Sequence, residues 1–166
     1  LDEAYYPYSK TTLINEINNY KNLIVVRSLK AFGLSGLRVG YLVSNKNFVE
    51  KVSSYRPLYE INSIGAFLFL ELLKNYTKVK KSISNLLLAR NYFIKELNKR
   101  NIKFLKSFGN FTHIKIEKNR DKILNFISKK IYIRENEEHP SLKGYSRISF
   151  TTKKNYQFIL KAIDRF

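Results

Sequence analysis

Residues 23–43 constrain the fold most, because they place two apolar stretches on either side of a glycine-rich loop. Leu23–Val26 is a continuous apolar run, which is typical of a strand buried on both faces of an α/β sheet. A second strand is predicted at 40–43, and it begins at the last of three glycines. The loop contains Lys30 and no acidic residue. A lysine on the surface does not need a glycine-rich loop without acidic residues, whereas a lysine that contacts a bound anion does.

Length and charge limit the classes of protein that remain. The chain has 166 residues, 44% of them hydrophobic, so it can bury a core as one domain or one and a half. Its 31 Lys and Arg against 13 Asp and Glu give a net charge of +18, which could serve to neutralise nucleic-acid phosphates. The basic residues are spread along the whole chain, however, and this pattern disfavours a dedicated nucleic-acid surface.

Cysteine is absent, which excludes a disulfide framework, a thiol nucleophile and a cysteine metal site. His113 and His139 share no ligand spacing, so we expect surface or strand-packing residues rather than metal ligands, and no metal. Apolar runs are too short to cross a membrane and no signal peptide is recognisable, which predicts a cytoplasmic protein without a membrane partner. Residues 1–4 read as a strand that ends in a functional turn, so we expect the chain to begin within a domain.

Hydrophobic periodicity predicts an α/β part followed by an α+β part, divided near residue 60. The stretch Asn45-Lys46-Asn47 is expected to offer a helix N-cap. Asn62 either caps the next helix, which is favoured, or lines the entrance of the site, and the apolar run 67–70 is expected to lie in the core. Predicted helices cover 12–20, 47–54, 63–99 with a break near 76–77, 119–130 and 153–165; predicted strands cover 23–27, 40–43, 102–104, 111–116, 131–134 and 145–150.

Three clusters carry groups suited to catalysis: Asp2–Tyr5, Ser28–Arg38 and Tyr145–Ile148. A lysine amine attacks a carbonyl only when partly deprotonated, which neighbouring positive charge and desolvation favour. Lys30 lies close in sequence to Arg27 and Arg38, and arginine grips phosphate through two hydrogen bonds. An aspartate could keep a ring nitrogen protonated. Pyridoxal phosphate needs these parts: an amine for its aldehyde, a phosphate clamp and a pyridinium partner.

The order and wording of three motifs resemble a known family. DEAYYPY, NLIVVRSLKAFGLSGLRVGYLVS and IYIRENEEHPSLKGYSRISFTT resemble fold type I pyridoxal-phosphate enzymes, and among them the class I/II aminotransferases of the histidinol-phosphate aminotransferase group. The resemblance covers nearly the whole chain but only the C-terminal portion of a family member. It implies an α/β fold in which residues 1–60 end the cofactor-binding large domain, with its mostly parallel sheet, and residues 61–166 form the small α+β C-terminal domain.

The resemblance also implies a role for each cofactor-binding position. Asp2 matches the aspartate that pairs with the pyridinium nitrogen, and Tyr5 the tyrosine that hydrogen-bonds the phenolic oxygen of the ring. Lys30 matches the lysine that forms a Schiff base with pyridoxal 5'-phosphate and later moves a proton. Arg38 matches the arginine that clamps the phosphate, and Ser28 is expected to supply a hydroxyl to it.

On the substrate side, Arg147 matches an arginine that grips a carboxylate or phosphate, and Arg134 resembles a second one. The implied activity is transfer of an amino group between a donor such as glutamate and a small, phosphorylated or carboxylated carbonyl substrate, by a homodimer. An amino-acid-phosphate decarboxylase on the same fold is the first alternative. A non-catalytic basic nucleic-acid-binding module is the alternative from another class. In that case Lys30 and the arginines are surface or ion-pair residues.

Two departures from the family pattern matter. The family reads Ser/Thr-x-Ser-Lys, whereas Ser28-Leu29-Lys30 is one residue shorter, which shifts the hydroxyl by about 3.3–3.6 Å if the chain is extended there. The family's N-terminal half also contributes a phosphate-binding turn, an aromatic ring on the cofactor and an asparagine, and none of these matches a segment of this chain. The sequence therefore predicts part of a pocket.

Overall fold

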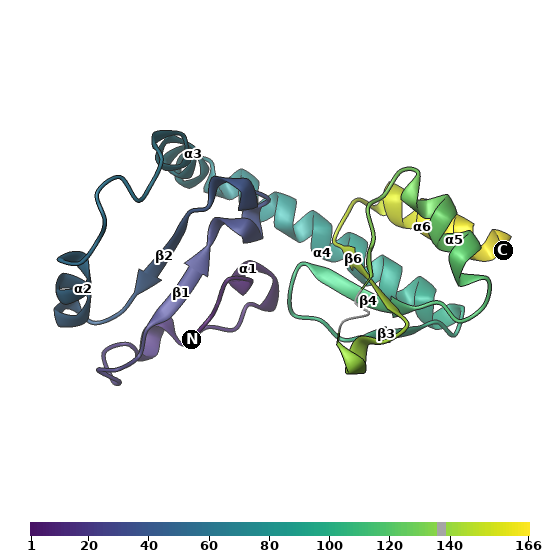
Figure 1. Ribbon diagram of the computed structural model, residues 1–166, viewed down its shortest axis with the longest axis horizontal. Coiled ribbons are helices and arrows are strands. Elements are labelled where there is room, and N and C mark those ends of the chain that lie inside the picture. Colours follow the sequence, from purple (N-terminus) through teal and green to yellow (C-terminus); the bar gives the residue numbers. More distant parts are fainter. Residues whose placement is uncertain (136–138) are drawn as a thin grey trace. The chain divides into compact units, whose positions relative to one another are not determined.

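The computed structural model describes residues 1–135 and 139–166 and forms two compact units, residues 1–81 and 82–166 (Figure 1). The break in the long helical stretch falls at Asn75, close to the predicted position. The sequence pattern placed the domain division near residue 60, and the identity of the two domains stays a prediction. Part of the third motif, 136–138, lies outside the described residues.

The sheet of the first unit is small. Strands β1 (Val25–Ser28) and β2 (Gly40–Val43) pair antiparallel, with Ser28 opposite Gly40. The parallel pairing expected for this part is confined, among the described residues, to a bridge between Asp2 and Val26. The short connection from β1 to β2 explains the difference, because a parallel neighbour would need a longer crossover.

The helices of the first unit are α1 (Tyr6–Ser9), α2 (Lys46–Ser53) and α3 (Ser63–Lys74). Both predicted caps are confirmed: the Asn45 side chain accepts from the Phe48 amide at 3.0 Å, and the Asn62 side chain accepts from the Gly65 amide at 2.7 Å. The helix predicted at 12–20 is only a 3₁₀ turn, η1 (Ile14–Glu16). Three asparagines within that range favour turns over a continued helix.

Helix α3 buries only a narrow stripe of its surface. Gly65 and Leu72 are buried, whereas Phe67 is 61% and Leu70 57% exposed. The prediction that the whole run 67–70 lies in the core is therefore wrong for these two residues. A helix buries only the side that faces a neighbouring element, and the described residues of this unit cover one side of α3.

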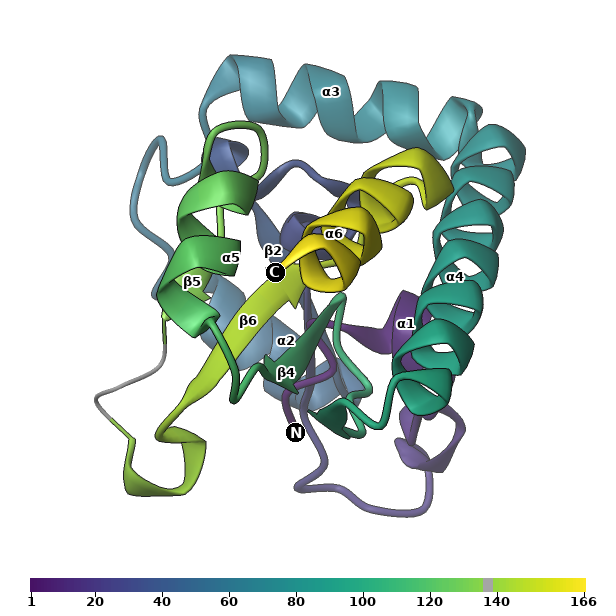
Figure 2. The ribbon, with the colours of Figure 1, turned by 90° about the vertical axis from the view of Figure 1, so that its right-hand side faces the viewer.

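The second unit has a four-stranded antiparallel sheet with the order β3–β4–β6–β5, and Figure 2 labels three of its strands, β4, β6 and β5. Its strands are β3 (Lys103–Leu105), β4 (Phe111–Lys115), β5 (Arg134–Glu135) and β6 (Tyr145–Ser149). Helix α4 spans Tyr76–Lys99, and its C-terminal part belongs to this unit. The other helical segments are α5 (Arg120–Ser128), the 3₁₀ turn η4 (Pro140–Leu142) and α6 (Lys153–Arg165). The order of strands and helices agrees with the predicted α+β pattern.

The core of this unit lies between the sheet and the helices. Ile114 and Ile148 point from the sheet toward Phe93 of α4 and Tyr156 of α6, whose rings stack 4.3 Å apart. Burial raises the pKa of Tyr156 to about 12. Because strand side chains alternate, His113 and its neighbours on β4 and β6 lie on the opposite face. No helix in the described part of the chain is long and apolar enough to span a bilayer.

Candidate active site

The segment around Lys30 is fixed by its immediate neighbours. Ser28 ends β1 in an extended conformation, and its hydroxyl accepts from the Lys30 amide at 3.3 Å. The 3₁₀ turn η2 (Leu29–Phe32) follows directly, and Leu29 and Ala31 are completely buried in it. Its neighbours on both sides are buried in the core, whereas Lys30 itself is half-buried.

The amine of Lys30 lies over an aromatic ring. Its Nζ is 4.8 Å from the centre of the Tyr5 ring, within the range of a cation–π contact. Within 1–135 and 139–166, no carboxylate lies within 4.0 Å of this amine to form an ion pair. The structure thus brings together two residues that the sequence placed 25 positions apart.

Asp2 reaches the same sheet by a different route. Its backbone bridges Val26 of β1, and one of its carboxylate oxygens accepts from the Ala4 amide at 2.7 Å. That bond makes the turn that leads from the strand-like residues into Tyr5 and α1. Asp2 itself is exposed, so its carboxylate is held by a local hydrogen bond in the segment that delivers Tyr5.

Arg38 follows the 3₁₀ turn η3 (Ser35–Leu37) and adopts a left-handed backbone conformation, with a φ of 58°. It is exposed, and no described carboxylate lies within ion-pair distance of its guanidinium. Two residues later, Gly40 sits so close to β1 that a Cβ there would lie 2.9 Å from the Arg27 carbonyl oxygen. Glycine is therefore required at position 40, beside the strand that leads into Lys30.

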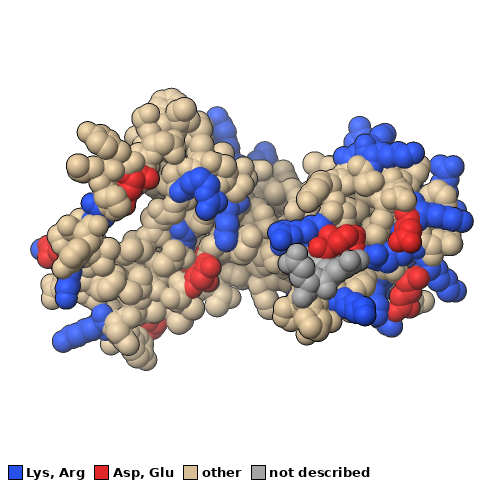
Figure 3. All heavy atoms as spheres, in the orientation of Figure 1, with Lys and Arg blue, Asp and Glu red and all other residues tan. Residues whose placement is uncertain are grey.

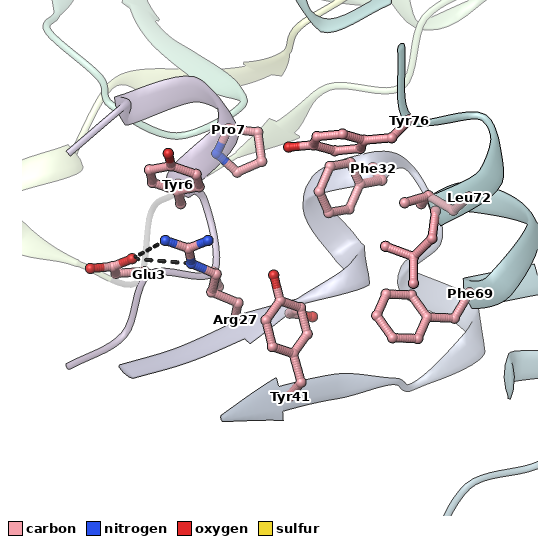
Figure 4. Close-up of a pocket in the computed structure, with 12 residues that line it drawn as sticks. Glu3, Tyr6, Pro7, Arg27, Phe32, Tyr41, Phe69, Leu72 and Tyr76 are labelled. Atoms are coloured by element: carbon pink, nitrogen blue, oxygen red, sulfur yellow. Dashed lines mark hydrogen bonds and ion pairs between the residues drawn. The ribbon is translucent and has the colours of Figure 1, made fainter. Parts of the chain in front are cut away.

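A buried ion pair beneath this segment escaped the sequence analysis. The Arg27 guanidinium binds the Glu3 carboxylate at 2.9 Å and lies 3.8 Å from the centre of the Tyr6 ring (Figure 4). Arg27 was expected to add to the positive surroundings of Lys30, but Glu3 neutralises it. The pairing depends on the bridge between Asp2 and Val26, one position before each of the two residues, and local sequence patterns do not reveal that bridge.

The Glu3 carboxylate also accepts from the Thr12 hydroxyl and the Leu13 amide, each at 2.8 Å. Burial by itself would raise the pKa of Glu3, but these hydrogen bonds and Arg27 outweigh burial and lower it. Glu3 is therefore an ionised structural anchor rather than a proton carrier.

A cavity of about 250 Å³ lies next to this ion pair (Figure 4). Aromatic and aliphatic side chains dominate its walls, and Arg27 and Ser28 contribute polar groups. Its lining includes Tyr41 and Phe69, whose rings stack 6.0 Å apart. Lys30 and Tyr5 are not among the lining residues, so the cavity and the lysine are separate features of this unit.

The second unit contains both predicted substrate-side arginines. Arg147 on β6 is directly opposite Arg134 on β5 and, across the other edge of β6, opposite His113 on β4. Burial, and after it the Arg147 cation, lower the pKa of His113 from its ordinary 6.5. Sequence reasoning missed this row, because strand register between distant segments is not visible in local patterns.

With this geometry in place, comparison with known proteins identifies the class. The chain belongs to the aminotransferase class I and II family, whose model matches residues 1–163. The family assignment agrees with the predicted resemblance and with its α/β fold.

Several known proteins are similar to the chain over nearly its whole length. A histidinol-phosphate aminotransferase from Sulfurisphaera tokodaii is 34% identical over 162 residues, which are 97% of this chain and 43% of that protein. The crystal structure of the histidinol-phosphate aminotransferase from Clostridium acetobutylicum has a TM-score of 0.81 at 25% identity, over 99% of this chain and 52% of that one. L-threonine-O-3-phosphate decarboxylase from Porphyromonas gingivalis shares the fold at the same TM-score and 23% identity, over 100% of this chain and 54% of that one. The chain spans about half the length of these proteins.

Proposed function

We propose that this chain is the C-terminal part of a pyridoxal-phosphate-dependent aminotransferase of the histidinol-phosphate aminotransferase kind. The observation that carries the proposal is the Lys30 amine lying 4.8 Å from the centre of the Tyr5 ring, with no described carboxylate paired to it. Family membership supports the class of reaction, and the relative that aligns over nearly the whole chain supports the group.

The residues of the first unit fit this cofactor chemically. An amine, a phenol, a carboxylate, a hydroxyl and a guanidinium are present at Lys30, Tyr5, Asp2, Ser28 and Arg38. Only one oxygen of Asp2 has a hydrogen bond from the described residues, which leaves the other for a protonated ring nitrogen. Arg38 is exposed and without a described acidic partner, as a phosphate-binding guanidinium requires.

When bound, the cofactor supplies an aldehyde that takes up the amino group and a ring that withdraws electrons from the substrate's α carbon. The protein's part is to hold groups and move protons. Lys30 would hold the cofactor's aldehyde carbon and move a proton, the Tyr5 hydroxyl would donate a hydrogen bond to the ring oxygen, and the Asp2 carboxylate would keep the ring nitrogen charged. These roles rest on the match to the family motif.

The second unit is proposed to supply the substrate's anion site. Arg147 and Arg134 lie side by side on neighbouring strands, and paired guanidiniums suit a carboxylate or phosphate. We propose a small phosphorylated carbonyl compound as the acceptor and an amino acid such as glutamate as the donor. A cytoplasmic homodimer stays an expectation.

The test is covalent trapping. The complete enzyme, incubated with pyridoxal phosphate and reduced with borohydride, should carry the cofactor on Lys30 in a peptide map. Lys30→Ala should lose the adduct and the activity, whereas the exposed Lys46→Ala should keep both. An adduct spread over surface lysines would contradict the proposal.

Product analysis separates the alternatives. Formation of a keto acid supports transamination, and release of carbon dioxide from an amino-acid phosphate would support the decarboxylase. The nucleic-acid-binding alternative requires a concentrated basic surface. On the visible face, Lys and Arg side chains are scattered among neutral and acidic ones (Figure 3), a distribution that favours the enzyme.

A further inference from the structure

We propose that His113 is a specificity-determining residue of the anion site on the second unit, where it favours a dianionic phosphate over a singly charged carboxylate. The inference rests on the proposed function, in which Arg147 binds the substrate. It adds a third member, from a different strand, to the pair of arginines.

The strand register places three basic side chains in one row. Arg134, Arg147 and His113 are consecutive partners across β5, β6 and β4. Directly opposite residues in an antiparallel pair have Cβ atoms about 4.5–5.5 Å apart and share a face. The buried residues Thr112 and Ile148 alternate with them and point the other way, so the row lies on the face without the core helices.

This row differs from its neighbour in charge balance. One step along the strands, Lys103 lies opposite Lys115, and both amines are within 4.0 Å of Glu117. In the described part of the chain, neither Arg134 nor Arg147 has a carboxylate at such a distance. Like charges directly opposite each other destabilise a sheet. An anionic ligand would relieve that repulsion.

Phe111 orients two members of the row. The Arg147 guanidinium carbon lies 5.1 Å from the centre of the Phe111 ring, and the His113 ring meets the same ring edge-on at 5.3 Å and 81°. Both basic groups are half-buried. A shared aromatic neighbour restricts their rotamers, so a ligand on Arg147 meets a preset imidazole.

When it is protonated, the His113 imidazole balances the second negative charge of a phosphate. Burial and Arg147 lower the pKa of His113 from its ordinary 6.5, which favours the neutral imidazole and so limits repulsion within the row. A dianion brings one more negative charge than the arginine facing it can balance, and this favours proton uptake by the imidazole. Among the described residues on these strands, the other charged or titratable groups near His113 are Arg134, Tyr145, Lys115 and Lys103, and the two lysines pair with Glu117.

The experiment uses the complete holoenzyme and two non-titrating probes: sulfate, a dianion with the shape of phosphate, and methanesulfonate, a monoanion. Their dissociation constants are measured calorimetrically between pH 5.5 and 8. Sulfate should bind about tenfold more tightly at the acid end, since an opposite charge at this range shifts a pKa by about one unit or more. Methanesulfonate should change little.

His113→Phe, which keeps the packing on Phe111, should abolish the pH dependence for sulfate. His113→Asn, smaller and polar, guards against a folding defect and should do the same. His139→Asn, at an exposed histidine, should behave like the unchanged protein. A pH dependence that survives both His113 variants, or disappears with His139→Asn, would overturn the inference.

The outcomes are distinguishable from failure of the proposed function. Arg147→Ala should remove sulfate binding at every pH. If it does not, the proposed substrate role of Arg147 fails. Loss of binding in Arg147→Ala together with unchanged pH dependence in the His113 variants overturns the role of His113 alone.

Discussion

Replacing Glu3 by glutamine should destabilise the first unit more than any conservative change on its surface. The Glu3 side chain is 5% exposed and accepts four hydrogen bonds: two from Arg27, at 2.9 and 3.1 Å, and one each from Thr12 and Leu13. Glutamine has a similar shape but one acceptor oxygen and no charge. Arg27 would be left buried without a counter-ion.

The magnitude follows from that unpaired charge. Removing one partner of a buried ion pair costs about 3–5 kcal/mol. The glutamine oxygen still accepts some of these hydrogen bonds. We therefore expect the free energy of unfolding to fall by about 3 kcal/mol, the lower end of that range. The matched control is Glu50→Gln, whose pair with Lys46 at 3.7 Å is exposed and should contribute at most about 0.5 kcal/mol.

The assay is hydrogen exchange of peptides from residues 1–44 during urea titration of the complete protein. It reports this region separately, since a chain with two units need not unfold in one step.

The effect should depend on pH with a definite sign. The pKa of Glu3 is lower in the folded protein than its ordinary 4.5, so the folded state holds the carboxylate more strongly charged than the unfolded state does. The stabilisation is present above pH 4.5 and is lost as the pH falls through the folded pKa. Equal losses in Glu3→Gln and Glu50→Gln, or a difference that does not shrink in acid, would refute this reasoning.

Three further predictions test the helices and the second core. Asn62→Ala removes the cap of α3 and should cost about 1 kcal/mol, with Asn62→Gly costing a few tenths, measured by hydrogen exchange of that helix. Phe93→Ala removes a ring stacked at 4.3 Å in the second core and should cost about 3–5 kcal/mol in urea unfolding, whereas Leu88→Ala on the exposed side of the same helix should stay within about 0.5 kcal/mol. Carbon NMR of labelled tyrosines should show Tyr156 ionising only near pH 12, and the free energy of unfolding should fall as the pH rises from 10 toward that value.

Local sequence signals predicted local structure well. The strand at 40–43 and the caps at Asn45 and Asn62 are found as predicted, because a capping side chain and an apolar run act within a few residues. The helix expected at 12–20 failed for the same kind of reason. Apolar spacing alone does not overcome three asparagines that favour turns.

Contacts that depend on register could not be read from the sequence. Glu3 meets Arg27 because Asp2 bridges Val26, and His113 meets Arg147 because β4 and β6 pair with that particular alignment. A shift of one residue would turn each side chain to the other face of its sheet. His113 was therefore missed as a neighbour of Arg147, whereas Arg134 and Arg147 were proposed as substrate-binding residues from the wording of the motif.

Ser28 provides a last prediction, since it stands where the family pattern is one residue longer. In the structure it ends β1 and its hydroxyl accepts from the Lys30 amide, so the turn η2 starts at once. A 3₁₀ turn rises only about 2.0 Å per residue, so the missing residue displaces the hydroxyl less than in an extended chain. Ser28 caps η2, and under the proposed function the same side chain is also a phosphate ligand.

Ser28→Ala should therefore weaken pyridoxal phosphate binding at least about tenfold, because a hydrogen bond to a charged group contributes about 1.5–3 kcal/mol and 1.4 kcal/mol is tenfold. Ser28→Thr keeps the hydroxyl and should restore binding. Ser35→Ala, at an exposed serine of the same loop, is the matched control. Cofactor affinity is measured by equilibrium dialysis of the complete enzyme. If Ser28→Ala binds the cofactor as the unchanged protein does, the shortened segment places its hydroxyl away from the phosphate and the proposed role of Ser28 is wrong.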